Sequence, residues 1–104
     1  MFYTALILQL RDGCLDAYRT AHEQLWPDVA EGLRSNGIDM VTYHHQGLLF
    51  IFASAPSEES WLRSRQDPSL AGWSIVMAKL LQTDAQGNII FHSPEKAFGF
   101  GKFA

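Results

Sequence analysis

The sequence predicts an α+β fold that occupies one domain over residues 1–104. Helix-like and strand-like hydrophobic patterns alternate along the chain, which disfavours an all-α or an all-β class. Apolar residues make up 47% of the 104 residues, enough to build one packed core without disulfides or metals. The length leaves no room for a second domain of ordinary size.

The first elements are expected to be a strand and a long helical segment. Residues 2–10 are β-prone and mostly apolar, as in a well-covered strand, and Asp12-Gly13 then forms a turn. The helical pattern that follows is interrupted at Pro27, which predicts a kink or a break near Trp26. Its stripe of residues three or four apart consists of Leu15, Tyr18, His22, Leu25, Val29 and Leu33.

A β-hairpin is expected next. Asn36-Gly37 ends the helical pattern. Residues 39–45 and 48–53 then have the composition of two strands, and Gln46-Gly47 joins them in a tight turn.

The remaining third of the chain is expected to hold helices and a last strand. Proline followed by acidic residues at positions 56–59 is typical of a helix start, and Asp67-Pro68 interrupts that helix. A further helix over about 70–81 and a polar turn over 84–88 lead to a strand that starts at Ile89.

The order β-α-β-β-α-β is that of the ferredoxin-like fold, with helices on one face of a four-stranded sheet. The other sheet face then needs a cover, which a homodimer that pairs two sheet faces, or a barrel, would provide. The chain after Pro94 has an irregular composition and is expected to form an edge strand or an arm.

Composition disfavours several classes of partner and compartment. The net charge is −3, and the eight basic residues are scattered, so no nucleic acid is expected as a partner. The lone Cys14 excludes an intramolecular disulfide and a cysteine-rich zinc site. Residues 1–10 lack the features of a secretion signal and are too short to span a membrane, so we expect a cytoplasmic protein without membrane contact.

Three residues of the first helical segment are the strongest candidates for chemistry. Tyr18, His22 and Trp26 are spaced i, i+4 and i+8, so their side chains lie close to one line. An imidazole with a phenol one turn away can donate and accept protons near neutral pH. The alternative is a core histidine that is hydrogen-bonded to Tyr18 or to a carbonyl, with Trp26 serving only for packing.

No motif in the sequence indicates a metal or a cofactor. His44 and His45 are neighbours on a predicted strand, and alternation sends them to opposite faces. Glycine-rich phosphate loops, nucleophile elbows and paired-carboxylate motifs are not found. Cofactor-free proton transfer and simple ligand binding are the remaining functions.

Residues 17–27 resemble the Tyr-x-x-x-His-x-x-x-Trp-Pro motif of the L-rhamnose mutarotases. Residues 36–43, 48–50, 57–61 and the pattern Trp73-x-x-x-Met77 are similar as well, so that the resemblance covers nearly the whole chain. It implies a homodimeric α/β barrel of ferredoxin-like subunits.

The resemblance also implies roles for individual residues. Tyr18 and His22 would be the catalytic acid/base pair, and Trp73, Trp26 and Tyr43 would contact a sugar. The reaction would interconvert the α and β anomers of a 6-deoxyhexose by ring opening and reclosure, which makes the protein an isomerase of carbohydrate metabolism.

The chain departs from the family pattern in two places. Members typically carry two adjacent tryptophans where this chain has Trp73 and Ser74, and residues 94–100 differ from the usual acidic, phenylalanine-containing ending. Because one of the two tryptophans is replaced, more than one 6-deoxy sugar is considered. L-Rhamnose is the first expected substrate and L-fucose the second. A cofactor-free monooxygenase of the same architecture and a non-catalytic binding module are the alternatives.

Overall fold

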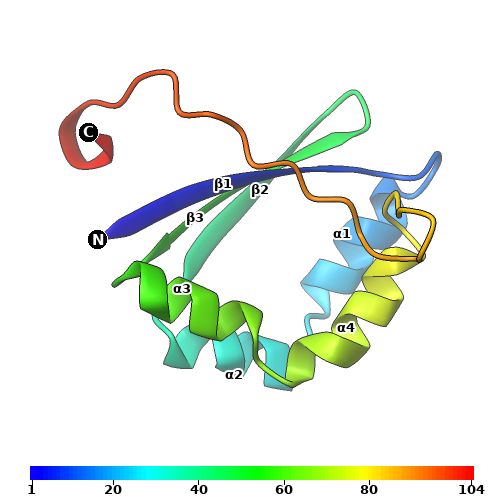
Figure 1. Ribbon diagram of the computed structural model, residues 1–104. Helices are drawn as coiled ribbons and strands as arrows, with labels where there is room; N and C mark the ends of the chain where they lie inside the picture. Colours follow the sequence, from blue (N-terminus) through cyan, green and yellow to red (C-terminus); the bar gives the residue numbers. More distant parts are fainter.

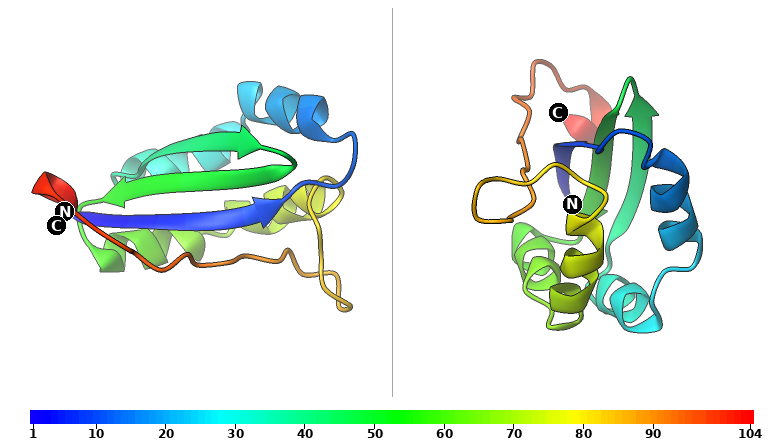
Figure 2. Two further views of the ribbon diagram at one scale, coloured as in Figure 1. Left: turned by 90° about the horizontal axis from the view of Figure 1, so that it is seen from above. Right: turned by 90° about the vertical axis from the view of Figure 1, so that its right-hand side faces the viewer.

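The computed structural model describes all residues from Met1 to Ala104 and is built around a three-stranded antiparallel sheet. The strands are β1 (Phe2–Gln9), β2 (Asp39–His45) and β3 (Leu48–Ala55), in the spatial order β1-β3-β2. The α-helices α1 (Leu15–Glu23), α2 (Pro27–Ser35), α3 (Glu58–Arg65) and α4 (Ser69–Ala78) lie on one side of this sheet (Figure 1). The other face carries no α-helix (Figure 2).

The predicted hairpin of β2 and β3 is confirmed. Its turn residues, Gln46 and Gly47, have φ angles of 51° and 81°. Positive φ at both central residues is the geometry of the tight turns whose twist matches that of the flanking strands. Because this turn sets the register, His45 pairs with Leu48 and Asp39 pairs with Ser54.

The predicted interruption of the first helical segment is a complete break. Glu23 ends α1, and Pro27 is the first residue of α2. The amide of a first helical residue has no partner within the helix, so the missing amide hydrogen of Pro27 costs no hydrogen bond. Trp26 is extended, with φ −59° and ψ 134°. This is the conformation that a following proline favours, since its ring crowds the helical form of the preceding residue.

The two later helices also begin where the sequence predicts. Ser57 Oγ accepts a hydrogen bond of 3.1 Å from the Ser60 amide and caps α3. At the start of α4, Asp67 Oδ1 accepts one of 2.9 Å from the Ser69 amide. Both hydrogen bonds satisfy amide groups that a helix start leaves without a partner.

The predicted fourth strand is wrong. Of the residues from Ile89 onward, only His92 bridges the outer edge of β1, where it pairs with Ile7 through two backbone hydrogen bonds of 2.8 and 2.9 Å. In the same register the next outward pair would place Pro94 opposite Ala5. Because proline has no amide hydrogen, the ladder ends there and the chain runs on beside β1 (Figure 2).

The chain after Pro94 forms an arm, one of the two forms expected for it. It ends in the short 3₁₀-helix η1 (Gly101–Phe103), and Phe98 and Phe100 are exposed along it. The Phe103 ring lies 4.7 Å from that of Tyr3, between centroids.

The main core lies between the helices and the sheet. It gathers buried side chains of β1, β3 and all but one of the helices, and Leu49 at 1% exposure is its most enclosed member. No helix combines the length and the apolar character that crossing a bilayer requires. The members of this main core are Leu8, Leu10, Tyr18, Val29, Leu49, Trp73, Met77 and Leu81.

Candidate active site

The structure brings together four of the five residues that the sequence marks as site candidates. Tyr18 and His22 lie on α1 with their ring centroids 4.1 Å apart. Trp73 of α4 meets the His22 ring edge-on at 5.2 Å and the Trp26 ring edge-on at 5.4 Å. We call Tyr18, His22, Trp26 and Trp73 the aromatic cluster.

His22 is exposed, and its hydrogen bond determines which ring nitrogen is basic. Nδ1 lies 2.8 Å from the backbone carbonyl oxygen of Tyr18. A carbonyl only accepts hydrogen bonds, so Nδ1 carries the proton and donates it to that oxygen. In the neutral ring Nε2 therefore keeps a free lone pair. The alternative interpretation, a core histidine bonded to a carbonyl, is confirmed for the carbonyl partner. It is wrong for the core, because His22 is exposed.

Tyr18 differs from His22 because it is buried, with 7% of its surface exposed. Burial raises the pKa of the Tyr18 phenol, and the polar side chain of Thr42 lowers it by a smaller amount. The resulting pKa is above the ordinary value of 10.0, so the phenol keeps its proton at neutral pH. Tyr18 is thus a proton donor beside an imidazole with a free lone pair.

The two tryptophans have different surroundings. Trp73 is 8% exposed and belongs to the main core, whereas Trp26 is 40% exposed. Trp26 packs over Gly72 of α4, where a Cβ would lie 3.2 Å from the indole ring. The lack of a side chain at Gly72 lets the indole approach α4 closely. Ser74, which stands where the family has its second tryptophan, is exposed.

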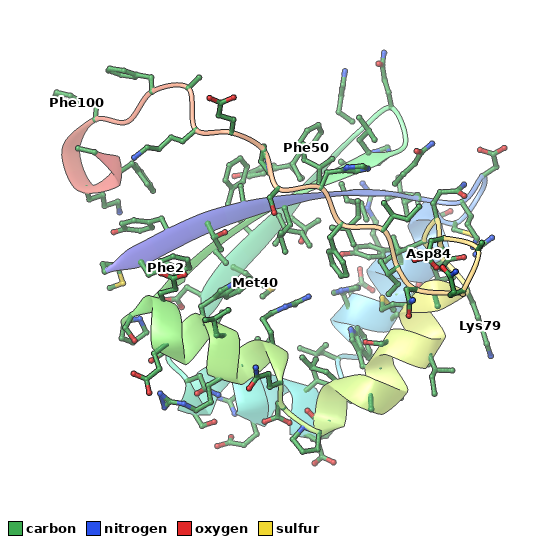
Figure 3. All side chains as sticks on the ribbon, viewed as in Figure 1. Phe2, Met40, Phe50, Lys79, Asp84 and Phe100 are labelled. Atoms are coloured by element: carbon green, nitrogen blue, oxygen red, sulfur yellow. The ribbon has the colours of Figure 1, made fainter.

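Tyr43, the fifth candidate, is not brought to the aromatic cluster of its own chain. It pairs with Phe50 across the hairpin, and its ring contacts Phe52 at 6.1 Å on the sheet face that carries no helix. The labelled side chains of Phe50 and Met40 lie on the two opposite sides of the sheet (Figure 3). Tyr43 and the aromatic cluster are thus separated by the sheet.

Thr42 is the site residue that the sequence reasoning missed. Successive side chains of a strand point to opposite faces, so Thr42 faces the helices because Tyr43 does not. The alternation of side chains along β2 could have identified Thr42 as the neighbour of Tyr43 on the opposite face. That step also required placing β2 next to the first helix.

The remaining histidines are not part of the cluster. His44 Nε2 accepts a hydrogen bond of 3.1 Å from the Gly47 amide and so supports the hairpin turn. His92 belongs to the bridge with Ile7. Nowhere do three or more His, Cys, Asp or Glu side chains gather in a metal-binding arrangement.

Fold and cluster together define a class, an α+β protein that holds an imidazole and a protonated phenol beside indole rings. Within that class the chain belongs to the L-rhamnose mutarotase family, since the model of that family matches residues 3–96. The resemblance seen in residues 17–27 is thereby confirmed.

Curated relatives agree with this assignment. An L-rhamnose mutarotase of Shouchella clausii is 24% identical over 101 residues, which cover 94% of this chain and 97% of the relative. An L-rhamnose mutarotase of Burkholderia ambifaria is 29% identical over 101 residues, which cover 90% of this chain and 93% of the relative.

Solved structures confirm the ferredoxin-like α+β fold. The crystal structure of an L-rhamnose mutarotase from Formosa agariphila superposes with a TM-score of 0.81 at 21% identity, over 97% of this chain and all of that one. A dimeric ferredoxin-like protein from an uncultured marine organism gives a TM-score of 0.67 at 13% identity, over 98% of this chain and all of that one.

Proposed function

We propose that this protein is a mutarotase that interconverts the α and β anomers of a 6-deoxyhexose, with L-rhamnose as the first substrate and L-fucose as the second. The observation that carries the proposal is the Tyr18–His22 pair, in a chain that belongs to the L-rhamnose mutarotase family. The pair offers one proton acceptor and one proton donor within one turn of α1.

The proposed reaction passes through the open aldehyde. Ring opening removes a proton from the anomeric hydroxyl and delivers one to the ring oxygen. His22 Nε2 takes the first proton because it holds the free lone pair, and the protonated phenol of Tyr18 supplies or relays the second. Reclosure on the other face of the aldehyde repeats the exchange in reverse.

The Trp26 ring suits the apolar side of such a sugar. It is the one indole of the aromatic cluster that is substantially exposed, and a flat ring packs well against C–H groups. A 6-deoxyhexose carries a methyl group in place of one hydroxymethyl group, which adds to its apolar surface. We propose Trp26 and Trp73 as the aromatic contacts of the substrate.

Saturation-transfer NMR between anomeric protons tests this function. Protein at catalytic concentration is expected to accelerate exchange between the anomers of L-rhamnose, and of L-fucose to a smaller degree, above the rate in buffer. D-Glucose is the control sugar, because it keeps the hydroxymethyl group. Equal exchange with and without protein for both 6-deoxy sugars would contradict the proposal. Oxygen uptake with an electron-rich aromatic compound would instead support the monooxygenase.

We also propose that two copies pair through the sheet face that carries no helix. Tyr43 and Phe52 on that face are 59% and 50% exposed, and Val41 and Leu48 are exposed beside them. An apolar patch of this kind is costly to leave in water. The dimeric state of the ferredoxin-like structural neighbour adds support.

Placing a charge in the centre of this face should break the pair. For Phe52→Glu, light scattering coupled to size-exclusion chromatography is expected to give the mass of one chain, against twice that mass for the unchanged protein, because the interface would bury an unpaired carboxylate. Ile75→Glu is the control, since Ile75 is 66% exposed on α4, on the helical side. A wild type that runs as a monomer, or a Phe52→Glu variant that stays dimeric, would contradict the pairing.

A further inference from the structure

Trp26 lies outside the helices, so the position of its ring depends on what the ring contacts. It stands in the linker between α1 and α2, immediately before Pro27. Its indole ring meets Trp73 edge-on at 5.4 Å between centroids and lies over the neighbouring Gly72. Both residues belong to α4, which packs against α2. The surface of α4 at residues 72–73 therefore determines where the Trp26 ring sits.

Gly72 is a glycine in the interior of a helix, a place where this residue type is unfavourable. α4 runs from Ser69 to Ala78. Glycine destabilises a helix relative to alanine, because it loses more backbone freedom on folding. The φ angle of Gly72 is not positive, so alanine would adopt the same backbone conformation. The backbone does not require glycine here, and the reason for it lies in the space around position 72.

That space is occupied by the Trp26 ring. A Cβ atom at position 72 would lie 3.2 Å from Cζ3 and 3.6 Å from Cη2 of Trp26. Carbon atoms in favourable contact are about 3.5–4.0 Å apart, so the nearer of these two contacts is too short. The ring has room to move outward, because 40% of Trp26 is exposed. A side chain at position 72 would therefore displace the indole rather than the backbone of α4.

We infer that Gly72 is a positioning residue for the substrate, because its missing side chain sets how close the Trp26 ring lies to the rest of the aromatic cluster. This inference rests on the proposed anomer exchange, in which Trp26 contacts the sugar. His22 and Trp26 meet the same Trp73 ring edge-on, at 5.2 and 5.4 Å. An outward shift of Trp26 changes the distance between the aromatic contact of the sugar and the base that takes its proton.

Gly72→Ala tests the role directly. The added Cβ moves the indole by a few tenths of an ångström. A misplacement of about 1 Å can cost about 10²-fold in rate, so we expect kcat/KM for anomer exchange to fall about two- to tenfold. The loss should appear mainly in KM, because Trp26 contacts the sugar but transfers no proton. Gly72→Leu has a larger side chain, also favours a helix, and should lower kcat/KM further.

Ala71→Gly is the matched control. It is the reverse exchange of the same two residue types, at an exposed neighbouring position of α4. It weakens the helix but places no atom beneath Trp26, so kcat/KM should keep its wild-type value. A loss of kcat/KM in Ala71→Gly as large as that in Gly72→Ala would show a general effect of altering α4 and would overturn the inference.

Two further readouts show whether Gly72 acts through Trp26. In a Trp26→Ala background, Gly72→Ala should cause no further loss of kcat/KM, because residues that act through one contact are not additive. Indole rings in edge-on contact also couple electronically, which gives paired circular dichroism bands in the far ultraviolet. These bands should be lost in Trp26→Ala, altered in Gly72→Ala and unchanged in Ala71→Gly.

The outcomes separate this inference from the proposed function. A wild type that exchanges anomers together with a Gly72→Ala variant of equal kcat/KM overturns the role of Gly72 and leaves the function standing. A full additional loss from Gly72→Ala in the Trp26→Ala background overturns it as well. A wild type that exchanges the anomers of neither 6-deoxy sugar overturns the proposed function, and the role of Gly72 falls with it.

Discussion

His22→Ala is expected to lower the enzyme-catalysed rate of anomer exchange by about 10²- to 10⁴-fold, the usual contribution of one positioned acid or base. The substitution removes Nε2, the nitrogen with the free lone pair. Because His22 is exposed and donates only to the carbonyl one turn earlier, its loss should leave the fold intact.

Saturation-transfer NMR on L-rhamnose measures this effect, with circular dichroism to show that the variant is folded. Glu23→Gln is the matched control, since Glu23 is the next residue on α1, is exposed and lies outside the aromatic cluster. It should exchange anomers at the wild-type rate. A folded His22→Ala variant that retains the wild-type rate would show that His22 is not the base.

Trp73→Ala is expected to have the largest effect on stability. Removing a buried tryptophan side chain costs about 3–5 kcal/mol of unfolding free energy, because apolar burial is lost and a cavity remains. Trp73 is 8% exposed in the main core and contacts both the His22 and the Trp26 rings. A domain of this size is stable by about 5–15 kcal/mol, so the loss is a large share of the total.

Urea unfolding followed by circular dichroism checks this expectation. Trp26→Ala is the comparison, because the same residue type at 40% exposure has less apolar contact to lose. Its unfolding free energy should therefore fall by clearly less. Equal losses for the two variants, or a loss below about 1 kcal/mol for Trp73→Ala, would contradict the core position of Trp73.

Local chemistry explains the elements that the sequence predicts well. Pro27 breaks the first helical segment through its own ring and its missing amide hydrogen, and Gln46-Gly47 adopts the positive φ angles that a tight hairpin needs. Both features depend on residues adjacent in the chain. The helix motif of residues 17–27 is also local, which is why it already indicates the family.

The wrong prediction, a fourth strand, concerns contacts between distant parts of the chain. Ile89 and its neighbours have the composition of a strand, yet whether they pair depends on the register with β1, which sets Pro94 opposite Ala5 and ends the ladder after His92. The face on which Tyr43 lies likewise follows from the hairpin register and from the packing of the helices, and its role as a sugar contact stays a prediction.

By itself the sequence determined the order of the elements from β1 to α4, the break at Pro27, the family, and the spacing that puts Tyr18 and His22 one turn apart on α1. Only the tertiary structure decided which residues surround that pair: it placed Trp73 and Thr42 beside it, left His22 exposed and buried Tyr18. The reason is physical. Turns, helix ends and the tautomer of His22 depend on neighbours in the chain, whereas burial and the pKa of Tyr18 depend on side chains that meet only when distant segments pack.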